Sequence, residues 1–215
     1  MHQVGNIMLV FLSKRQKDSI RAFLNRIGCK TRDWARVVMY EECIKLIEAL
    51  GPGKMDALEI SAGFEWKNLG FKSFTEVNFP EFDICTQTTD QEFDIIIADQ
   101  VWEHLLWPYK ATKNVLSMLR PGGYFLITTP FLIKVHDVPI DCSRWTELGL
   151  KYFLAECGFS LEGIVTGSWG NRKAVIGNLQ RFPKGFYRSL KNEPEYPLTV
   201  WALARKSADE PAAQV

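Results

Sequence analysis

The chain has 215 residues, of which 47% are hydrophobic and 24% are charged, a composition typical of a soluble globular protein. This length is enough for one good-sized domain with its own core, so neither disulfides nor a structural metal is needed for stability. The net charge of +1 excludes a general electrostatic attraction to nucleic acid or to an anionic membrane, although local basic patches remain open.

Residues 7–50 are expected to be mainly helical. Residues 33–50 place apolar side chains on one face at helical spacing, Asp33 is a plausible N-cap, and the sequence GPG at 51–53 ends the helix. The apolar run at 7–12 is too short for a membrane span, which takes roughly 20 residues. We therefore interpret it as part of an amphipathic helix or a packing arm.

Short buried strands follow, separated by turns and helices. The next helix starts near Pro108, carries an apolar stripe from Ala111 to Leu119, and is expected to end at Gly122-Gly123. A further helix has Thr146 as N-cap and ends at Gly158. The predicted strands are 56–61, 73–79, 93–99, 124–130, 161–167 and 198–204.

The last two strands have no strong helix between them. That segment is rich in glycine, proline and basic residues, and Trp169, Asn171, Arg172 and Lys173 are expected in a solvated turn. The predicted organisation is a helical extension at 1–54, a domain at 55–206 and a disordered tail at 207–215.

Strands that alternate with helices predict an α/β fold with a doubly wound, mostly parallel sheet covered on both faces, in three α/β/α layers. The final pair of strands allows one antiparallel edge strand. Ligands of such sheets bind beyond the carboxyl ends of the strands, where the strand order reverses. Asp99, Trp102, Glu103 and His104 follow the carboxyl end of a predicted buried strand, so they stand where a ligand is expected.

The turn after the first strand combines a carboxylate with small residues. Glu59 near the strand end is followed by Ser61, Ala62 and Gly63, which let a ligand approach the backbone closely. A dinucleotide site would require G-x-G-x-x-G here, and this turn has only Gly63. The turn therefore argues against NAD.

Three segments occur in a characteristic order: LEISAG at 58–63, FDIIIADQVWEHL at 93–105 and MLRPGGYFLITTPF at 118–131. In this respect the chain resembles the class I S-adenosylmethionine-dependent methyltransferases, in their small-molecule and saccharide-type group. The resemblance covers about residues 55–160. It implies a Rossmann-like fold, S-adenosyl-L-methionine as cofactor, and a small-molecule or saccharide acceptor methylated at oxygen.

The resemblance also implies positions for the cofactor. The first turn would hold its methionine part, an amide after the second strand would bind the ribose hydroxyls, and an acidic residue would lie near the adenine. Two residues after the strand 93–99 would flank the amino-acid end. The implied cofactor-binding residues are Glu59, Ser61, Ala62, Gly63, Asn78, Asp83, Asp99 and Gln100.

The loop HDVPIDCSRWT at 136–146 follows the predicted strand 124–130, after which the family that the chain resembles builds much of its acceptor pocket. A sugar pocket requires carboxylates and an aromatic face, and the implied acceptor-binding residues are Asp137, Asp141, Arg144 and Trp145. His136 is the first candidate for a general base and His104 the second. No metal site is expected, because adjacent residues such as His136 and Asp137 rarely converge on one ion without further ligands.

Five scattered cysteines, odd in number and without a CxxC pair, argue against a disulfide framework and a zinc knuckle, so a reducing cytoplasm is the expected location. They are Cys29, Cys43, Cys85, Cys142 and Cys157. No nucleic-acid partner and no transmembrane segment are expected, and the chain is expected to be a monomer or a homodimer.

Two alternatives stay open. One is a protein or nucleic-acid methyltransferase, although the Asn/Asp-Pro-Pro-aromatic stretch of the nucleobase enzymes is replaced here by ADQVW. The other is an inactive scaffold that kept the fold. That alternative is favoured by Ser61 and Glu65, which stand where the family usually has glycines, and by the short connection from Asn78 to Asp94.

Overall fold

The structure is a computed structural model that describes residues 36–61, 63, 66–137, 139–179 and 190–208. Residues from Val38 onward belong to one compact unit. The expectations for residues 1–35, including the Asp33 cap, for Ala62 and for the tail from 209 lie outside the described residues.

Six strands form one sheet in the order β2-β1-β3-β4-β6-β5. The first four strands run parallel to one another, and β6 runs antiparallel to both β4 and β5. The predicted mostly parallel sheet with antiparallel pairing toward one edge is confirmed, and the antiparallel strand lies one place in from the edge strand. The strands are β1 (Asp56–Ile60), β2 (Ser73–Val77), β3 (Phe93–Asp99), β4 (Leu119–Pro130), β5 (Ile164–Trp169) and β6 (Thr199–Arg205).

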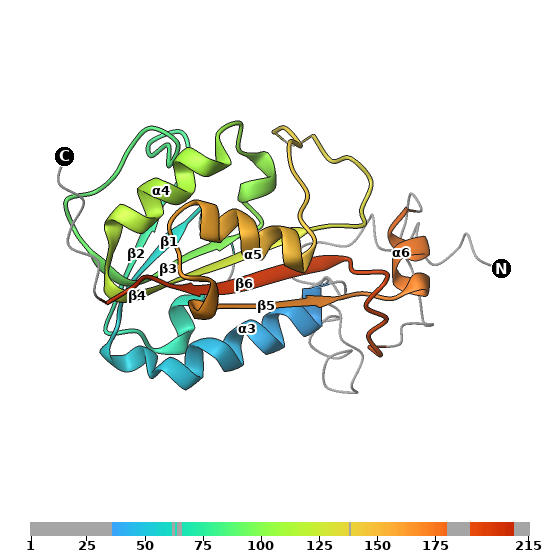
Figure 1. Ribbon diagram of the computed structural model, residues 1–215, viewed down its shortest axis with the longest axis horizontal. Helices are drawn as coiled ribbons and strands as arrows, with labels where there is room; N and C mark the ends of the chain where they lie inside the picture. The colour runs from blue at the N-terminus through green and yellow to red at the C-terminus, as the bar shows by residue number, and fades with distance from the viewer. Residues whose placement is uncertain (1–35, 62, 64–65, 138, 180–189, 209–215) are drawn as a thin grey trace, which may run out of the picture. The chain divides into compact units, whose positions relative to one another are not determined.

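Helices lie on both faces of the sheet, which gives the predicted three layers. Figure 1 shows α3 on one face and both α4 and α5 on the other. The α-helices are α3 (Val37–Leu50), α4 (Pro108–Met118), α5 (Glu147–Glu156) and α6 (Arg172–Leu179). Short 3₁₀ turns are η2 (Pro52–Lys54), η3 (Trp66–Leu69), η4 (Trp102–His104) and η5 (Leu161–Gly163).

Local signals explain the ends of α5 and the start of α4. Pro108 occupies the first turn of α4, where its missing N–H costs nothing. Thr146 caps α5 through its hydroxyl, which accepts a hydrogen bond from Gly149 N at 3.0 Å. Gly158 follows α5 with a φ of 115°, a left-handed conformation that suits glycine.

The helix that begins at Pro108 does not end at Gly122-Gly123 as predicted. The helix α4 ends at Met118, and β4 begins at once because Leu119 pairs with Phe93 of β3. The register then shifts, and Tyr124 is the partner of Ile95, so both glycines lie in an irregular part of the strand. Pairing between distant segments has overridden the local glycine signal.

The expected solvated turn at 169–173 is also corrected. Asn171 is 4% exposed, and its side-chain oxygen accepts a hydrogen bond from Ala174 N at 2.8 Å, which caps α6. Between β2 and β3, in contrast, residues 78–92 contain turns and neither helix nor strand, as the short connection predicted.

The core lies against both faces of the sheet. On the face of α4 and α5, a continuous apolar cluster joins the sheet to both helices and includes Ile96, Phe125, Val115, Met118 and Leu154. Side chains alternate along a strand, so Ile95, Ile97 and Leu126 point to the opposite face, where α3 lies. On α3 itself, Met39, Cys43 and Ile47 are fully buried.

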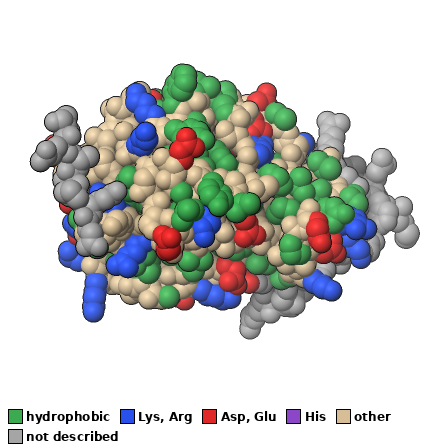
Figure 2. Space-filling model, in the orientation of Figure 1, with side chains coloured by type: hydrophobic (Ala, Val, Ile, Leu, Met, Phe, Trp, Pro, Cys, Tyr) green, Lys and Arg blue, Asp and Glu red, His purple; other side chains and the backbone are tan. Residues whose placement is uncertain are grey.

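The surface charge and the helix lengths agree with the composition of the chain. On the face that Figure 2 shows, basic and acidic side chains are interspersed, in agreement with the net charge of +1. Within the part of the chain that the structure describes, no helix has the length and apolar character needed to cross a bilayer.

A charged cluster joins the amino ends of the strands. Asp56 accepts hydrogen bonds from Ser73 Oγ at 2.8 Å, from Lys72 Nζ at 3.2 Å and from Arg120 Nη1 at 3.0 Å. Arg120 Nη1 also donates to Asp94 Oδ2 at 2.6 Å. The hydrogen bond from Ser73, followed by those from Lys72 and Arg120, lowers the pKa of Asp56 to about 2. This cluster stabilises the end of the sheet opposite to the expected ligand site.

The lowered pKa predicts acid-sensitive stability. An unfolded aspartate titrates near pH 4, about two units above Asp56 in the folded chain, so its contribution is complete above about pH 4 and is lost as the pH falls toward 2. We expect the free energy of unfolding, measured by denaturant titration, to fall less between pH 7 and pH 3 in Asp56→Asn than in the unmodified chain. Ser73→Ala should reduce the difference in the same direction. An unchanged difference in Asp56→Asn would contradict this assignment.

Candidate active site

The carboxyl ends of four parallel strands meet at one edge of the sheet. Ile60 at the end of β1 pairs with Val77 of β2 and with Ala98 of β3, and Asp99 pairs with Thr128 of β4. The strand order reverses at β1, because β2 lies on one side of it and β3 on the other. This edge is therefore the switch point at which open α/β sheets bind their ligands.

The turn after β1 contains a buried carboxylate and a left-handed residue. Glu59 is 1% exposed, and its Oε1 accepts a hydrogen bond from Gly63 N at 3.2 Å. Ser61 has a φ of 59°, and its N–H donates to Val77 O at 2.8 Å. A non-glycine residue in this conformation costs of order 1 kcal/mol and persists where the surroundings enforce it. The backbone at position 61 therefore has the left-handed conformation that usually favours glycine, although the residue is serine.

The turn after β3 has the same backbone conformation. Gln100 has a φ of 58°, and its N–H donates to Thr128 O at 3.0 Å. Its side-chain amide donates to Thr128 Oγ1 at 3.1 Å. Two neighbouring strands therefore end in left-handed, non-glycine residues at the same level of the sheet, a concentration of strain typical of ligand-binding turns.

Asp99 connects three elements at this edge. Its Oδ2 accepts a hydrogen bond from Tyr40 Oη of α3 at 2.9 Å, and its Oδ1 accepts one from Thr128 Oγ1 at 2.5 Å. Burial, assisted by the charges of Asp99 and Glu42, raises the pKa of the Cys43 thiol well above its usual range. Cys43 is therefore a neutral packing group at neutral pH and not a nucleophile.

The two remaining predicted cofactor residues follow β2. Asn78 is exposed directly after the strand, and its carbonyl accepts a hydrogen bond from Phe82 N at 2.9 Å. Asp83 stabilises the next turn, with Oδ1 accepting from Cys85 N at 2.9 Å and Oδ2 from Thr86 Oγ1 at 3.2 Å. Both residues lie on the connection that follows β2, and the Asp83 carboxylate is engaged locally.

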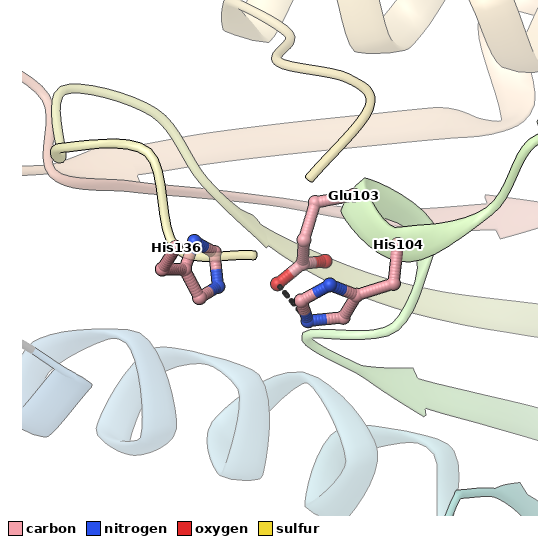
Figure 3. Close-up of side chains that lie close together, drawn as sticks. All are labelled: Glu103, His104 and His136. Atoms are coloured by element: carbon pink, nitrogen blue, oxygen red, sulfur yellow. Dashed lines mark ion pairs between the residues drawn. The ribbon is translucent and has the colours of Figure 1, made fainter. Parts of the chain in front are cut away.

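A second group of polar side chains gathers beside this edge. Glu103 and His104 lie on η4, which follows β3, and His136 lies on the loop after β4. Figure 3 shows the three side chains pointing toward a common space. Glu103 Oε1 lies 3.8 Å from His104 Nε2, and the two imidazole centroids are 5.1 Å apart. The structure thus brings together the two histidines predicted as candidate bases, from segments more than thirty residues apart.

Asp141 organises the loop that carries His136. Arg144 donates to both of its carboxylate oxygens, from Nη1 to Oδ1 and from Nη2 to Oδ2, the latter at 2.5 Å. His136 N donates to Oδ2 at 2.9 Å. The Arg144 hydrogen bonds, against the effect of burial, lower the pKa of Asp141 to about 2. Asp141 and Arg144 are therefore paired with each other.

The other two predicted acceptor residues differ in their surroundings. Asp137 is exposed next to His136. The Trp145 ring packs on Phe153 of α5 with centroids 5.1 Å apart, against the core cluster. This contact anchors the loop to α5.

Two residues of the site, Thr128 and Tyr40, are absent from the prediction, and a third, Glu103, was expected near the ligand without an assigned role. Glu103 was visible as the polar residue of a WEH sequence, but its burial and its proximity to His136 arise from tertiary structure. Thr128 and Tyr40 had no local signal, because each is recognised by its hydrogen bond to Asp99.

Residues 26–170 match the family described as a methyltransferase domain. Solved structures with a similar fold include an S-adenosylmethionine-dependent methyltransferase from Mesorhizobium loti, with a TM-score of 0.52, 15% identity, and coverage of 75% of this chain and 96% of that one. A possible histamine N-methyltransferase from Thermotoga maritima has a TM-score of 0.55, 14% identity, and coverage of 87% and 100%.

A third similar structure contains ligands. It is the 1,6-didemethyltoxoflavin-N1-methyltransferase of Burkholderia thailandensis, with 1,6-didemethyltoxoflavin and S-adenosylhomocysteine bound. Its TM-score is 0.57 at 13% identity, with coverage of 89% of this chain and 87% of that one. At these identities the three structures establish the similarity of the fold.

One curated relative carries a different name, phosphoribosylaminoimidazole-succinocarboxamide synthase from Pelagibacter ubique. It is 27% identical over 147 residues, which are 68% of this chain and 51% of the relative. The chain thus spans about half the length of that relative, and the match carries no argument about activity.

Proposed function

Since this chain belongs to the family of S-adenosylmethionine-dependent methyltransferases, we propose that it transfers the methyl group to an oxygen atom of a small molecule or a saccharide. The observation that carries this proposal is the pair of left-handed turns at Ser61 and Gln100, on adjacent strand ends, beside the buried carboxylate of Glu59.

The cofactor is proposed to lie across these strand ends. Glu59 holds the turn through Gly63 N, which leaves the backbone of Ser61 and Gly63 close to the methionine part. Asp99 and Gln100 flank the amino-acid end, with Thr128 fixing both side chains. Asn78 and Asp83 are the proposed contacts for the ribose and the adenine.

Methyl transfer from a sulfonium is an in-line displacement in which the donor is already activated. The enzyme therefore acts mainly by positioning and desolvation. A hydroxyl acceptor must also lose its proton, and we assign this requirement to the His104–His136 pair, which lies on the loops that follow β3 and β4. Asp137, exposed next to His136, is a proposed contact for a hydroxylated acceptor, and Asp141, Arg144 and Trp145 shape the loop that receives it.

A small-molecule acceptor agrees with the relative from Burkholderia thailandensis, which binds 1,6-didemethyltoxoflavin. A saccharide is proposed because the loop 136–146 presents the exposed carboxylate of Asp137, which can accept hydrogen bonds from hydroxyl groups. The opposing candidate is an inactive scaffold, which is favoured by serine at position 61 and by the absence of a helix from 78–92. The left-handed φ of Ser61 supports the enzyme, because the turn keeps its path despite the substitution.

Thermal-shift titration with S-adenosylmethionine and S-adenosylhomocysteine tests the proposal. A ligand that binds only the folded chain stabilises it by RT ln(1 + [L]/Kd), or about 2.7 kcal/mol at 100 times Kd. We expect the melting temperature to rise with cofactor concentration, and labelled methyl groups to appear on a hydroxylated acceptor in a screen of small molecules and saccharides. No stabilisation at millimolar cofactor would instead support the scaffold.

A further inference from the structure

The side chains of Glu103, His104 and His136 form a set of donors with the composition of a metal site. One ligand atom from each residue lies within 4.8 Å of the others. Two donors bound to one tetrahedral Zn²⁺ lie about 3.4 Å apart, so side-chain rotations that bring the donors about 1 Å closer place this set at bonding distance. Figure 3 shows the three side chains side by side, Glu103 and His104 from η4 and His136 from the loop after β4.

The second nitrogen of each imidazole is held by the protein. His104 Nδ1 makes a short hydrogen bond with Ile140 O, and a carbonyl can only accept, so Nδ1 carries the proton. His136 Nδ1 lies 3.3 Å from Asp141 Oδ2, a carboxylate that Arg144 also holds, with Arg144 Nη2 itself 3.4 Å from Nδ1. Carbonyl and carboxylate partners of this kind fix the ring of a ligating histidine and direct its Nε2 lone pair to the metal.

Glu103 supplies the negative charge of the set. Its side chain is 0% exposed, whereas those of His104 and His136 are 18% and 33% exposed. A carboxylate oxygen is a common ligand of divalent cations, and an ion at this point would lie beside a charge of opposite sign. The two imidazoles are partly exposed, so solvent reaches the histidine side of the set.

The backbone joins the two segments that carry these donors. Glu103 O accepts hydrogen bonds from Cys142 N at 2.7 Å and from Ser143 N at 3.3 Å. These bonds attach the loop 136–146 to η4, so the relative positions of Glu103 and His136 are set by the fold and do not depend on the metal. A preorganised donor set of this kind binds an ion with little loss of conformational freedom.

We propose that Glu103, His104 and His136 bind one divalent first-row transition-metal cation, of the Zn²⁺ and Mn²⁺ class, through one carboxylate oxygen and the two Nε2 atoms. Two imidazoles and a carboxylate suit such ions, and three protein ligands leave coordination positions open for a substrate oxygen. This set differs from the adjacent pair His136 and Asp137, which the sequence argued against, because it draws on two segments.

The inference deepens the proposed function and rests on it for the role of the ion. A cation that binds the acceptor hydroxyl lowers its pKa, and the hydroxyl proton passes to solvent. The oxygen then forms a bond to the methyl carbon while the bond from carbon to sulfur breaks, with its electron pair remaining on sulfur. With the ion bound, His104 and His136 assist the loss of the hydroxyl proton as metal ligands, and direct uptake of that proton by the pair applies to the metal-free chain.

Metal binding is measured on the full chain after treatment with a chelator. We expect titration with Co²⁺, followed by visible absorption, and with Zn²⁺, followed by elemental analysis, to give one ion per chain. Glu103→Gln and His136→Ala should each weaken Co²⁺ binding at least about 100-fold, and Asp141→Asn, which removes a supporting partner, about 10-fold.

Cys142→Ser is the matched control, because Cys142 is an exposed thiol in the same loop that itself attracts soft metals. It should leave Co²⁺ affinity unchanged, and the cobalt spectrum should show no thiolate charge-transfer band. Stoichiometric binding that survives both Glu103→Gln and His136→Ala, or no binding at all, would overturn the site.

Cofactor titration of the same samples separates this inference from the proposed function. A thermal shift with S-adenosylhomocysteine in Glu103→Gln and His136→Ala shows that the variants are folded. A chain that binds cofactor but no metal refutes the metal site alone. A chain that binds metal but no cofactor supports the site and refutes the methyltransferase.

Discussion

Gly170→Ala is expected to lower the free energy of unfolding by about 3 kcal/mol, the largest effect on stability among the substitutions considered. Gly170 is buried between β5 and α6, and a Cβ there would lie 2.1 Å from Tyr196 O and 2.4 Å from Leu198 N. Both atoms belong to the backbone, so no side chain can rotate away. The clash can be relieved only if the segment that leads into β6 moves. That segment is held in place by the hydrogen bond from Leu198 N to Trp169 O at 2.8 Å.

Gly177→Ala is the matched control for this prediction. Gly177 lies seven residues further on in α6, and an added Cβ meets no atom within 4 Å. Alanine has the higher helix propensity, so this variant should be unchanged or more stable by up to about 1 kcal/mol. Urea denaturation of the two variants beside the unmodified chain measures both effects. Equal stability of Gly170→Ala and Gly177→Ala would show that the backbone contact is not limiting.

Glu59→Gln is expected to weaken S-adenosylmethionine binding about 10- to 100-fold. The substitution keeps the size of the side chain but removes its charge, and hydrogen bonds to charged groups contribute about 1.5–3 kcal/mol. Glu59 Oε1 accepts from Gly63 N, so loss of the charge loosens the turn that is proposed to hold the cofactor. Isothermal titration with S-adenosylmethionine measures the change.

Two controls accompany Glu59→Gln. Glu76 is its neighbour on β2 in the same register, but it is exposed and pairs with Lys67 at 3.4 Å, so Glu76→Gln should leave the affinity unchanged. His136→Ala should also bind the cofactor nearly normally while methyl transfer slows. A similar loss of affinity in Glu59→Gln and His136→Ala would contradict the separation of cofactor and acceptor roles.

Most elements could be predicted from the sequence because their signals are local. Thr146 and Gly158 bracket α5, Pro108 begins α4, and alternating or continuous apolar runs mark each strand. The errors arose where a distant partner decided the outcome. Leu119 belongs to β4 and not to the helix because it pairs with Phe93 of β3, although the two glycines predicted a later end of the helix.

The places of the candidate site residues in the fold could be predicted in part. The positions of Glu59, Ser61 and Gln100 follow from strand ends, which the sequence marks well. The convergence of Glu103 with His136 required the sheet order, because β3 and β4 must be neighbours before their following loops can meet. Asp141 and Arg144 were expected to contact the acceptor, but they lie three residues apart and the structure pairs them with each other.

The hydrogen bond from Tyr40 to Asp99 connects α3 to the candidate site, in addition to the packing of α3 against the sheet. A boundary drawn at the first strand, which the sequence suggested, would divide this helix from the surface that it shields. A chain trimmed to begin there would leave Ile95, Ile97 and Leu126 facing water and would deprive Asp99 of one of its two hydroxyl donors. Any shortened version meant for crystallisation or for fusion to another protein should therefore retain the whole of α3.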